Sequence, residues 1–183
     1  MELFEKTLTQ EYKYKGKIIN LRFDTAVLPD GNECVREVVE HNGGVTVCAV
    51  TENKDVFLVR QFRYPYGEVV TETPAGKLEK GEDPFEAGKR ELEEEAGVTA
   101  DNFVFLGKFY PSPGYCGEII YLYAATKLHQ SRQNLDEDEF LNVEKISLDA
   151  AVDKILSGEI PDGKTQAVVL RTAAMIEKGE LEI

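Results

Sequence analysis

Alternating apolar and polar residues near the start of the chain predict short strands with a polar face. A Pro-Asp-Gly-Asn sequence at residues 29–32 is typical of a turn between two of them. The predicted strands are residues 12–19, 21–28 and 34–41. They carry few apolar side chains, so we expect this region to pack against another surface rather than to form a hydrophobic core of its own.

The rest of the chain mixes apolar runs, which predict buried strands, with segments of helical periodicity. The strands are expected at residues 45–50, 56–59, 103–109, 119–125 and 140–146, and the helices at 84–96, 148–156 and 166–178. A glycine-rich stretch at 67–81 precedes the first helix. Helices and strands do not alternate regularly, which predicts an α/β (α+β) fold with a mixed sheet between helices. We expect a β region at 1–42 followed by a main domain at 43–183.

The helix at 84–96 has recognisable ends. Asp83 can cap its N-terminus, Pro84 suits the first helical position, and Glu86 completes a capping-box-like pair. Gly97 can end it in a left-handed turn. Both boundaries of this helix therefore follow from the sequence.

One face of the same helix is expected to be buried, with two carboxylates along its margin. The buried stripe comprises Phe85, Gly88, Leu92 and Ala96. Glu91 and Glu95 are one turn apart and flank this stripe. Gly88 lies between them and the stripe, where its missing side chain leaves room for another group to approach.

The acidic residues at the C-terminal end of this helix lie where the helix dipole makes negative charge unfavourable. Glu93, Glu94 and Glu95 lie in the last turn, where each opposes the helix dipole by roughly 0.3–1 kcal/mol. Glu91 and Glu95 also repel each other. The alternative interpretation is an ordinary solvated acidic face of the helix. A bound divalent cation, however, would make the clustered negative charge favourable. Carboxylates are hard ligands, which favours Mg²⁺, with Mn²⁺ as a second choice.

Composition narrows the classes of function. The formal net charge is -13, which disfavours binding to nucleic acid or to anionic membranes. The chain has no apolar run long enough to span a membrane and no signal-peptide pattern near its start, so we expect a cytoplasmic protein. Three dispersed cysteines and two histidines support neither a disulfide framework nor a zinc site. If the protein is an enzyme, we expect carboxylates to be its catalytic groups.

The stretch from Gly76 to Val98 matches the Nudix box, G-x5-E-x7-R-E-U-x-E-E-x-G-U, at every specified position, and the chain therefore resembles Nudix hydrolases. The resemblance implies an α/β/α sandwich and hydrolysis of a pyrophosphate linked to a nucleoside. It implies the following roles: Glu91 and Glu95 as metal ligands, Glu94 as a further ligand or catalytic carboxylate, Ala75 as a carbonyl ligand, and Gly76, Glu82, Arg90 and Gly97 as the structural frame of the box.

Further segments resemble the ADP-ribose pyrophosphatase subfamily, above all Ser-Pro-Gly-Tyr-Cys-Gly-Glu at 112–118. The resemblance implies conversion of ADP-ribose to AMP and ribose 5-phosphate. Expected substrate contacts are Arg63, Glu72, Ser112, Gly114 and Glu118. For Arg63 the alternative is a surface salt bridge, and His41 is expected to end a strand rather than bind metal. In this subfamily polar N-terminal strands pair across a homodimer, so we expect a dimer.

A general base should come from outside the helix, because metal would occupy the helix carboxylates. The acidic loop offers Glu137 and Glu139, and less favourably Asp136 and Asp138, with a solvated turn as the alternative. Two other functions stay open: a pyrophosphatase acting on a nucleotide sugar such as GDP-mannose or ADP-glucose, and a non-catalytic nucleotide sensor. A sensor would be expected to lose box carboxylates, which this chain keeps.

Overall fold

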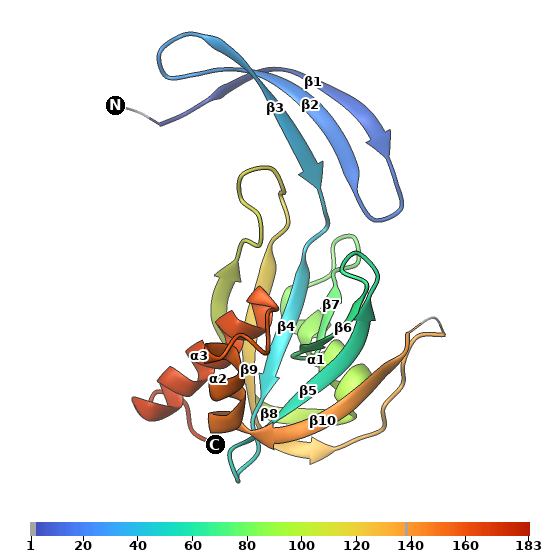
Figure 1. Cartoon of the computed structure of the whole chain (residues 1–183), viewed down its shortest axis with the longest axis vertical. Helices are drawn as coiled ribbons and strands as arrows, with labels where there is room; N and C mark the ends of the chain where they lie inside the picture. The colour runs from blue at the N-terminus through green and yellow to red at the C-terminus, as the bar shows by residue number, and fades with distance from the viewer. Residues whose placement is uncertain (1–2, 138) are drawn as a thin grey trace. The chain divides into compact units, whose positions relative to one another are not determined.

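The computed structural model describes residues 3–137 and 139–183 (Figure 1). Asp138, one of the two weaker base candidates, lies outside the described residues. The chain divides into two compact units. The N-terminal unit comprises Met1–Gly43 and Tyr110–Ile119, and the main unit comprises Gly44–Phe109 and Ile120–Ile183. None of the described helices is both long and apolar enough to cross a membrane.

The N-terminal unit is built on an antiparallel sheet in the order β1-β2-β3, formed by Lys6–Lys15, Asn20–Val27 and Glu33–Glu40. Every residue of β1 is exposed. The predicted first strand at 12–19 is wrong in its limits, because Gly16 N–H donates to the Ile19 carbonyl at 3.0 Å and closes a turn there. The segment Tyr110–Ile119 joins this sheet through backbone hydrogen bonds of Val39 with Tyr115 and Gly117.

The main unit holds two sheets. A mixed sheet runs β7-β4-β9-β8, with β4 parallel to β9, and an antiparallel sheet runs β10-β5-β6. The strands are β4 Gly44–Ala49, β5 Asp55–Arg63, β6 Glu68–Glu72, β7 Ala75–Lys77, β8 Val98–Phe109, β9 Ile120–Gln130 and β10 Leu141–Ser147; the helices are α1 Pro84–Ala96, α2 Leu148–Leu156 and α3 Gly163–Glu177.

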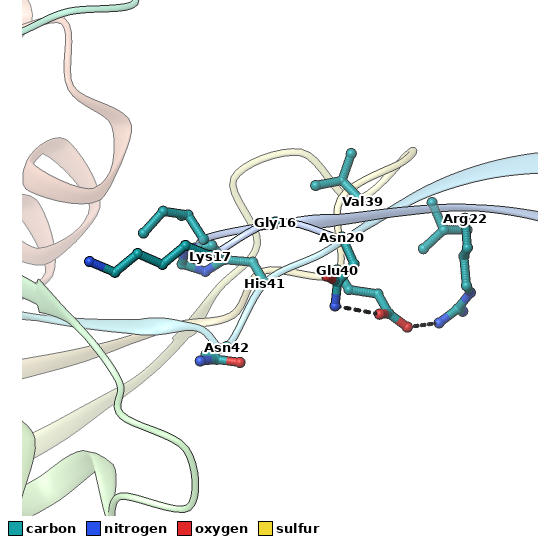
Figure 2. A pocket seen from close by; sticks show the side chains of 11 residues that line it. Gly16, Lys17, Asn20, Arg22, Val39, Glu40, His41 and Asn42 are labelled. Carbon is teal, nitrogen blue, oxygen red and sulfur yellow. Dashed lines mark hydrogen bonds and ion pairs between the residues drawn. The ribbon is translucent and has the colours of Figure 1, made fainter. Parts of the chain in front are cut away.

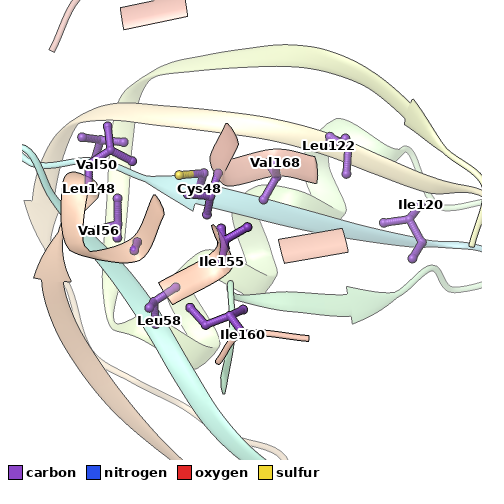
Figure 3. Packing of buried hydrophobic residues seen from close by; sticks show 12 residues of the cluster. Cys48, Val50, Val56, Leu58, Ile120, Leu122, Leu148, Ile155, Ile160 and Val168 are labelled. Carbon is purple, nitrogen blue, oxygen red and sulfur yellow. The ribbon is translucent and has the colours of Figure 1, made fainter. Parts of the chain in front are cut away.

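Strand β4 shows why helices cover both faces. Successive side chains of a strand point to opposite faces. Val45 and Val47 pack in a cluster with Ala87 and Leu92 of α1. Cys48 follows Val47, so it points to the opposite face, and it packs in the other cluster with residues of α2 and α3 (Figure 3). All six residues of the strand are buried, and five of them are apolar because the strand is covered on both sides. The expected α/β/α arrangement with a mixed sheet is confirmed.

Helix α1 has the predicted ends. Asp83 Oδ1 accepts hydrogen bonds from Phe85 N and Glu86 N, and Gly97 adopts φ 65°. Its face differs from the prediction at two residues. Phe85 is 36% exposed and meets Phe103 edge-on. A Cβ at Gly88 would lie 3.0 Å from the Phe103 ring, so this glycine admits an aromatic side chain rather than leaving room for a ligand.

Candidate active site

Two carboxylates of α1 are buried where the helix meets the start of β7. Glu91 is 9% exposed and Glu95 only 1%. Glu95 Oε2 accepts a hydrogen bond from Ala75 N–H at 2.8 Å. Glu95 has no ion-pair partner among the described residues. Burial of such a carboxylate is costly unless an opposite charge compensates it.

Gly76 makes the close packing of Glu91 possible. A Cβ at Gly76 would lie 1.9 Å from Glu91 Oε1. Any other residue here would displace the carboxylate. The room that the sequence suggested at Gly88 is therefore supplied by Gly76, on the strand that faces the helix.

The two carboxylates hold protons more tightly than free glutamate does. Burial is the largest effect and raises the pKa of Glu95 to about 9, with the charges of Glu139 and Glu91 adding to it. Burial raises the pKa of Glu91 to about 6, although the neighbouring Arg90 acts in the opposite direction. Without a cation the site is thus short of positive charge.

Arg90 gathers three acidic side chains of the box. Its Nε lies 3.0 Å from Glu82 Oε1, and its Nη1 lies 2.8 Å from both Glu91 Oε1 and Glu94 Oε2. Glu82 also accepts from Glu79 N–H at 2.8 Å, which fixes the loop that precedes α1. The guanidinium therefore braces loop and helix together.

The donor set fits a hard divalent cation. Within the described ranges, no three His, Cys, Asp or Glu side chains are arranged to hold a metal ion; Glu91 and Glu94 each pair with Arg90. Glu95 and Glu91 are nevertheless adjacent, buried and under-compensated oxygen donors, and the Ala75 carbonyl is in the same segment. Mg²⁺ typically uses only one or two protein carboxylates, together with water and substrate phosphate.

The acidic loop brings Glu139 to the two carboxylates, since its charge acts on both Glu91 and Glu95. Glu139 is half-buried, whereas Asp136 and Glu137 are exposed. Among the described acidic residues of this loop, Glu139 is therefore the base candidate whose charge acts on the helix carboxylates.

Arg63 and Glu72 form a bidentate ion pair in the main unit. Arg63 Nε and Nη2 donate to Glu72 Oε1 and Oε2 at 2.5 and 2.7 Å. Glu72 is 2% exposed; burial would raise its pKa, but Arg63 and Lys164 outweigh this and hold the pKa below its ordinary value. The charge of Glu95 acts on Arg63, so this pair lies within electrostatic reach of the helix carboxylates.

Three expected substrate contacts belong to the N-terminal unit: Ser112, Gly114 and Glu118. The Ser112 carbonyl accepts from Cys116 N–H at 2.9 Å, and Glu118 Oε1 lies 3.3 Å from Nδ1 of His41. A polar cavity of about 460 Å³ lies in the same unit, with Lys17, His41 and Asn42 in its lining (Figure 2). Asn20 and Arg22 donate to Glu40 there.

Comparison with known proteins assigns the family. The NUDIX domain profile matches residues 40–167, and the profile of the nucleoside diphosphate sugar hydrolase N-terminal domain matches residues 5–39. The chain belongs to the Nudix family. Its Nudix box occupies β7, the following loop and α1, where Glu91, Glu94 and Glu95 are all retained.

Several proteins resemble this Nudix chain over most of its length. It is 41% identical to a Bacillus subtilis (strain 168) protein named ADP-ribose pyrophosphatase, over 96% of this chain and 98% of the relative. It is 41% identical to a Bacillus methanolicus protein named methanol dehydrogenase activator, over 90% of each. A Yersinia enterocolitica protein named GDP-mannose pyrophosphatase is 34% identical over 90% and 87%. The solved structure of an "ADP compounds hydrolase", 19% identical, has a TM-score of 0.84 over 99% of this chain and 100% of that chain and shows the same fold.

Some features of this Nudix site were missed in the sequence. Lys164, at the start of α3, contacts Glu72, and no local pattern marks it. Gln133 and its neighbours bind the end of α1, where Gln133 Nε2 donates to the Glu95 carbonyl at 2.7 Å. Lys164 lies two residues after Asp162, which caps α3, but its contact with Glu72 is long-range, and such contacts leave no trace in periodicity.

Proposed function

We propose that this Nudix chain hydrolyses the pyrophosphate of ADP-ribose to AMP and ribose 5-phosphate, with Mg²⁺ as the ion and Mn²⁺ as its substitute. The observation that carries the proposal is the pair of buried, under-compensated carboxylates, Glu91 and Glu95, on the Nudix helix. The relative named ADP-ribose pyrophosphatase, similar over nearly the whole chain, supports the choice of substrate.

Glu91, Glu95 and the Ala75 carbonyl would hold the ion, with Glu94 as a further ligand or catalytic carboxylate. Such an ion supplies charge neutralisation of the pyrophosphate and lowers the pKa of bound water. In the step itself, a water oxygen forms a bond to one phosphorus atom while the bond from that phosphorus to the bridging oxygen breaks. Glu139 takes the water proton, and Glu137 is the alternative base.

Arg63 and Glu72 would contact the substrate next to the reacting phosphates. A guanidinium offers a planar fork that suits phosphate or ribose oxygens, and Glu72 keeps that fork in one orientation. We propose Ser112, Gly114 and Glu118 as further substrate contacts. Gly76, Glu82, Arg90 and Gly97 would support the site structurally.

Two alternatives are tested by one experiment. A nucleotide-sugar pyrophosphatase is supported by the relative named GDP-mannose pyrophosphatase, and a non-catalytic sensor would bind nucleotide without cleaving it. The protein is incubated with Mg²⁺ and ADP-ribose, ADP-glucose, GDP-mannose, NADH or diadenosine polyphosphates, and the products are separated by chromatography. Fastest release of AMP from ADP-ribose is expected. Preference for a sugar nucleotide would replace the substrate, and no cleavage of any compound would reject hydrolysis.

We further propose a cytoplasmic homodimer that binds neither nucleic acid nor membranes. Cys34, Cys48 and Cys116 are all free thiols, which suits a reducing compartment. The net charge of -13 opposes contact with polyanions. The exposed β1 strand supports pairing of the N-terminal unit with a second copy.

A further inference from the structure

Two consecutive residues at the start of α3 bind Glu72, the last residue of β6, and Thr73, which follows it. Lys164 Nζ contacts the Glu72 carboxylate and lies 3.0 Å from Asp162 Oδ2. Thr165 Oγ1 accepts a hydrogen bond from Thr73 N–H at 2.9 Å. The segment that leads to Ala75 and Gly76 is thereby attached to a helix that is remote from it in sequence.

Lys164 belongs to a charge cluster that is largely removed from solvent. The Lys164 side chain is 13% exposed and that of Glu72 is 2% exposed. Arg63 and Lys164 supply two positive charges, and Glu72 and Asp162 supply two negative ones. The cluster is therefore balanced, and loss of one member would leave a buried charge without its partner.

The carboxylate of Glu72 is shared between Arg63 and Lys164. Glu72 Oε2 accepts from both Arg63 Nη2 and Lys164 Nζ, while Oε1 accepts from Arg63 Nε. Lys164 thus fixes the rotation of the carboxylate that grips the guanidinium fork. The Arg63 side chain itself is 36% exposed, so it is accessible to a ligand, whereas Lys164 is too enclosed to serve as a primary contact.

We propose that Lys164 is a positioning residue, which acts through Glu72 to aim Arg63 at the phosphate or ribose oxygens of a nucleoside diphosphate substrate. The assignment rests on the proposed function for its catalytic consequence. Its structural half, the ordering of Arg63 by Lys164, does not depend on turnover and can be measured without substrate.

Steady-state kinetics with ADP-ribose and Mg²⁺ test the catalytic half. Lys164→Met should raise KM about tenfold while kcat changes less than about threefold, because binding through Arg63 is weakened. Lys164→Arg should restore most of the loss, and Lys164→Gln should be intermediate. Lys178→Met, at the exposed end of α3, is the matched control and should match the wild type. If both neutral variants fail to fold while Lys178→Met folds, Lys164 serves stability and the proposal is wrong.

A double-mutant cycle distinguishes positioning from general damage. If Lys164 acts through Arg63, then Lys164→Met should cost little in an Arg63→Ala background, so the two losses in kcat/KM should not multiply. Multiplicative losses would overturn the proposal, as would a wild-type KM in Lys164→Met.

An NMR measurement keeps failure of this proposal apart from failure of the proposed function. The Arg63 Nε–H proton should exchange slowly in the wild type and at least about tenfold faster in Lys164→Met, because it donates to a fixed Glu72. Unchanged exchange would overturn the positioning role. If the wild-type protein cleaves none of the nucleotides while the Nε–H proton responds as expected, hydrolysis fails and the ordering of Arg63 by Lys164 stands.

Discussion

At the scale of single residues, the site is governed by the cost of keeping Glu95 buried. Its ionised form is favoured by one backbone N–H and by the charge of Arg63, whereas the like charges of Glu139 and Glu91 oppose its ionisation. Because burial raises the pKa of Glu95 from 4.5 to about 9, the metal-free folded protein binds this proton more tightly than the unfolded chain. That contribution to stability is complete below pH 4.5 and is lost as the pH rises through 9.

Glu95→Gln should therefore stabilise the metal-free protein at pH 8, by at least about 1 kcal/mol or roughly 2–4 °C in Tm. At pH 4.5 or below the difference should largely vanish. Mg²⁺ should raise the Tm of the wild type at pH 8 but not that of the variant, which should also lose most turnover. Thermal melts with EDTA and with Mg²⁺ measure this, and Glu52→Gln, at an exposed turn residue, is the control that should leave the Tm unchanged. A lower Tm than wild type at pH 8 without metal would contradict the argument.

Replacing the two loop glutamates should have unequal effects. Glu139→Gln should lower kcat about 100-fold or more, because a base in reach of the attacking water contributes 10²–10⁴-fold. Glu137→Gln should stay within about threefold of the wild type, since Glu137 is exposed, whereas the charge of Glu139 acts on both helix carboxylates. Initial rates are compared at equal Mg²⁺ saturation. Near-normal rates in both variants would place the base elsewhere.

The residues of the Nudix box could be predicted because their spacing on one helix is local information. Glu91 and Glu95 follow from helical periodicity, and the acidic last turn of α1 marks them as unusual. The roles of Gly76 and Gly88 could not be predicted, because they depend on which residue of a distant strand approaches: Glu91 meets Gly76, and Phe103 meets Gly88. The structural role of each glycine is therefore set by its tertiary contacts.

At the scale of elements, the end of α1 is tied to the segment that carries the acidic loop. Asn134 N–H donates to the Glu94 carbonyl at 2.9 Å, and Ser131 N–H to the Gly97 carbonyl at 2.8 Å. Gln133 adds a side-chain hydrogen bond to the Glu95 carbonyl. These bonds satisfy carbonyls that the last turn of a helix leaves free. They also hold the loop with Glu139 near the carboxylates of α1.

Gln133→Ala should lower kcat about fivefold with little change in KM, because a lost hydrogen bond of roughly 1 kcal/mol loosens the loop without removing a substrate contact. Arg132→Ala is the matched control, since Arg132 is exposed and makes no hydrogen bond or ion pair to the described residues. Steady-state kinetics with ADP-ribose separates kcat from KM. A tenfold rise in KM at unchanged kcat would show that Gln133 acts on binding instead.

Strands β6 and β7 could not be predicted from the sequence. Their sequences are short and lie in a stretch interrupted by Pro74 and several glycines, so no alternation marks them. Each exists because a longer neighbour supplies its hydrogen bonds: β5 pairs with β6, and β4 with β7. By contrast α2 occupies the predicted residues, because its periodicity and its Ser147 cap are local.

At the scale of the whole molecule, acidic charge and an exposed polar sheet act together. A net charge of -13 keeps unspecific association low, so a stable contact between two copies needs a specific apolar surface. Exposed apolar side chains lie on the N-terminal sheet: Leu8 is 45% exposed and Val35 63% exposed. The outer edge of β1 is also unpaired within the described sheet, and such edges favour pairing with another chain.

We expect the wild-type protein to scatter light as a dimer, with about twice the chain mass of 20.5 kDa, at micromolar concentration. Leu8→Asp combined with Val35→Asp should shift it to the monomer, because each carboxylate would need to be desolvated at an apolar contact. Activity should fall with dissociation if the N-terminal unit completes the site of the second copy, and it should then recover at higher protein concentration.

Leu156→Asp, at an exposed apolar residue of α2, is the control that should leave the mass unchanged. A monomeric wild type would refute the dimer, and dissociation by the α2 variant alone would move the interface to the main unit.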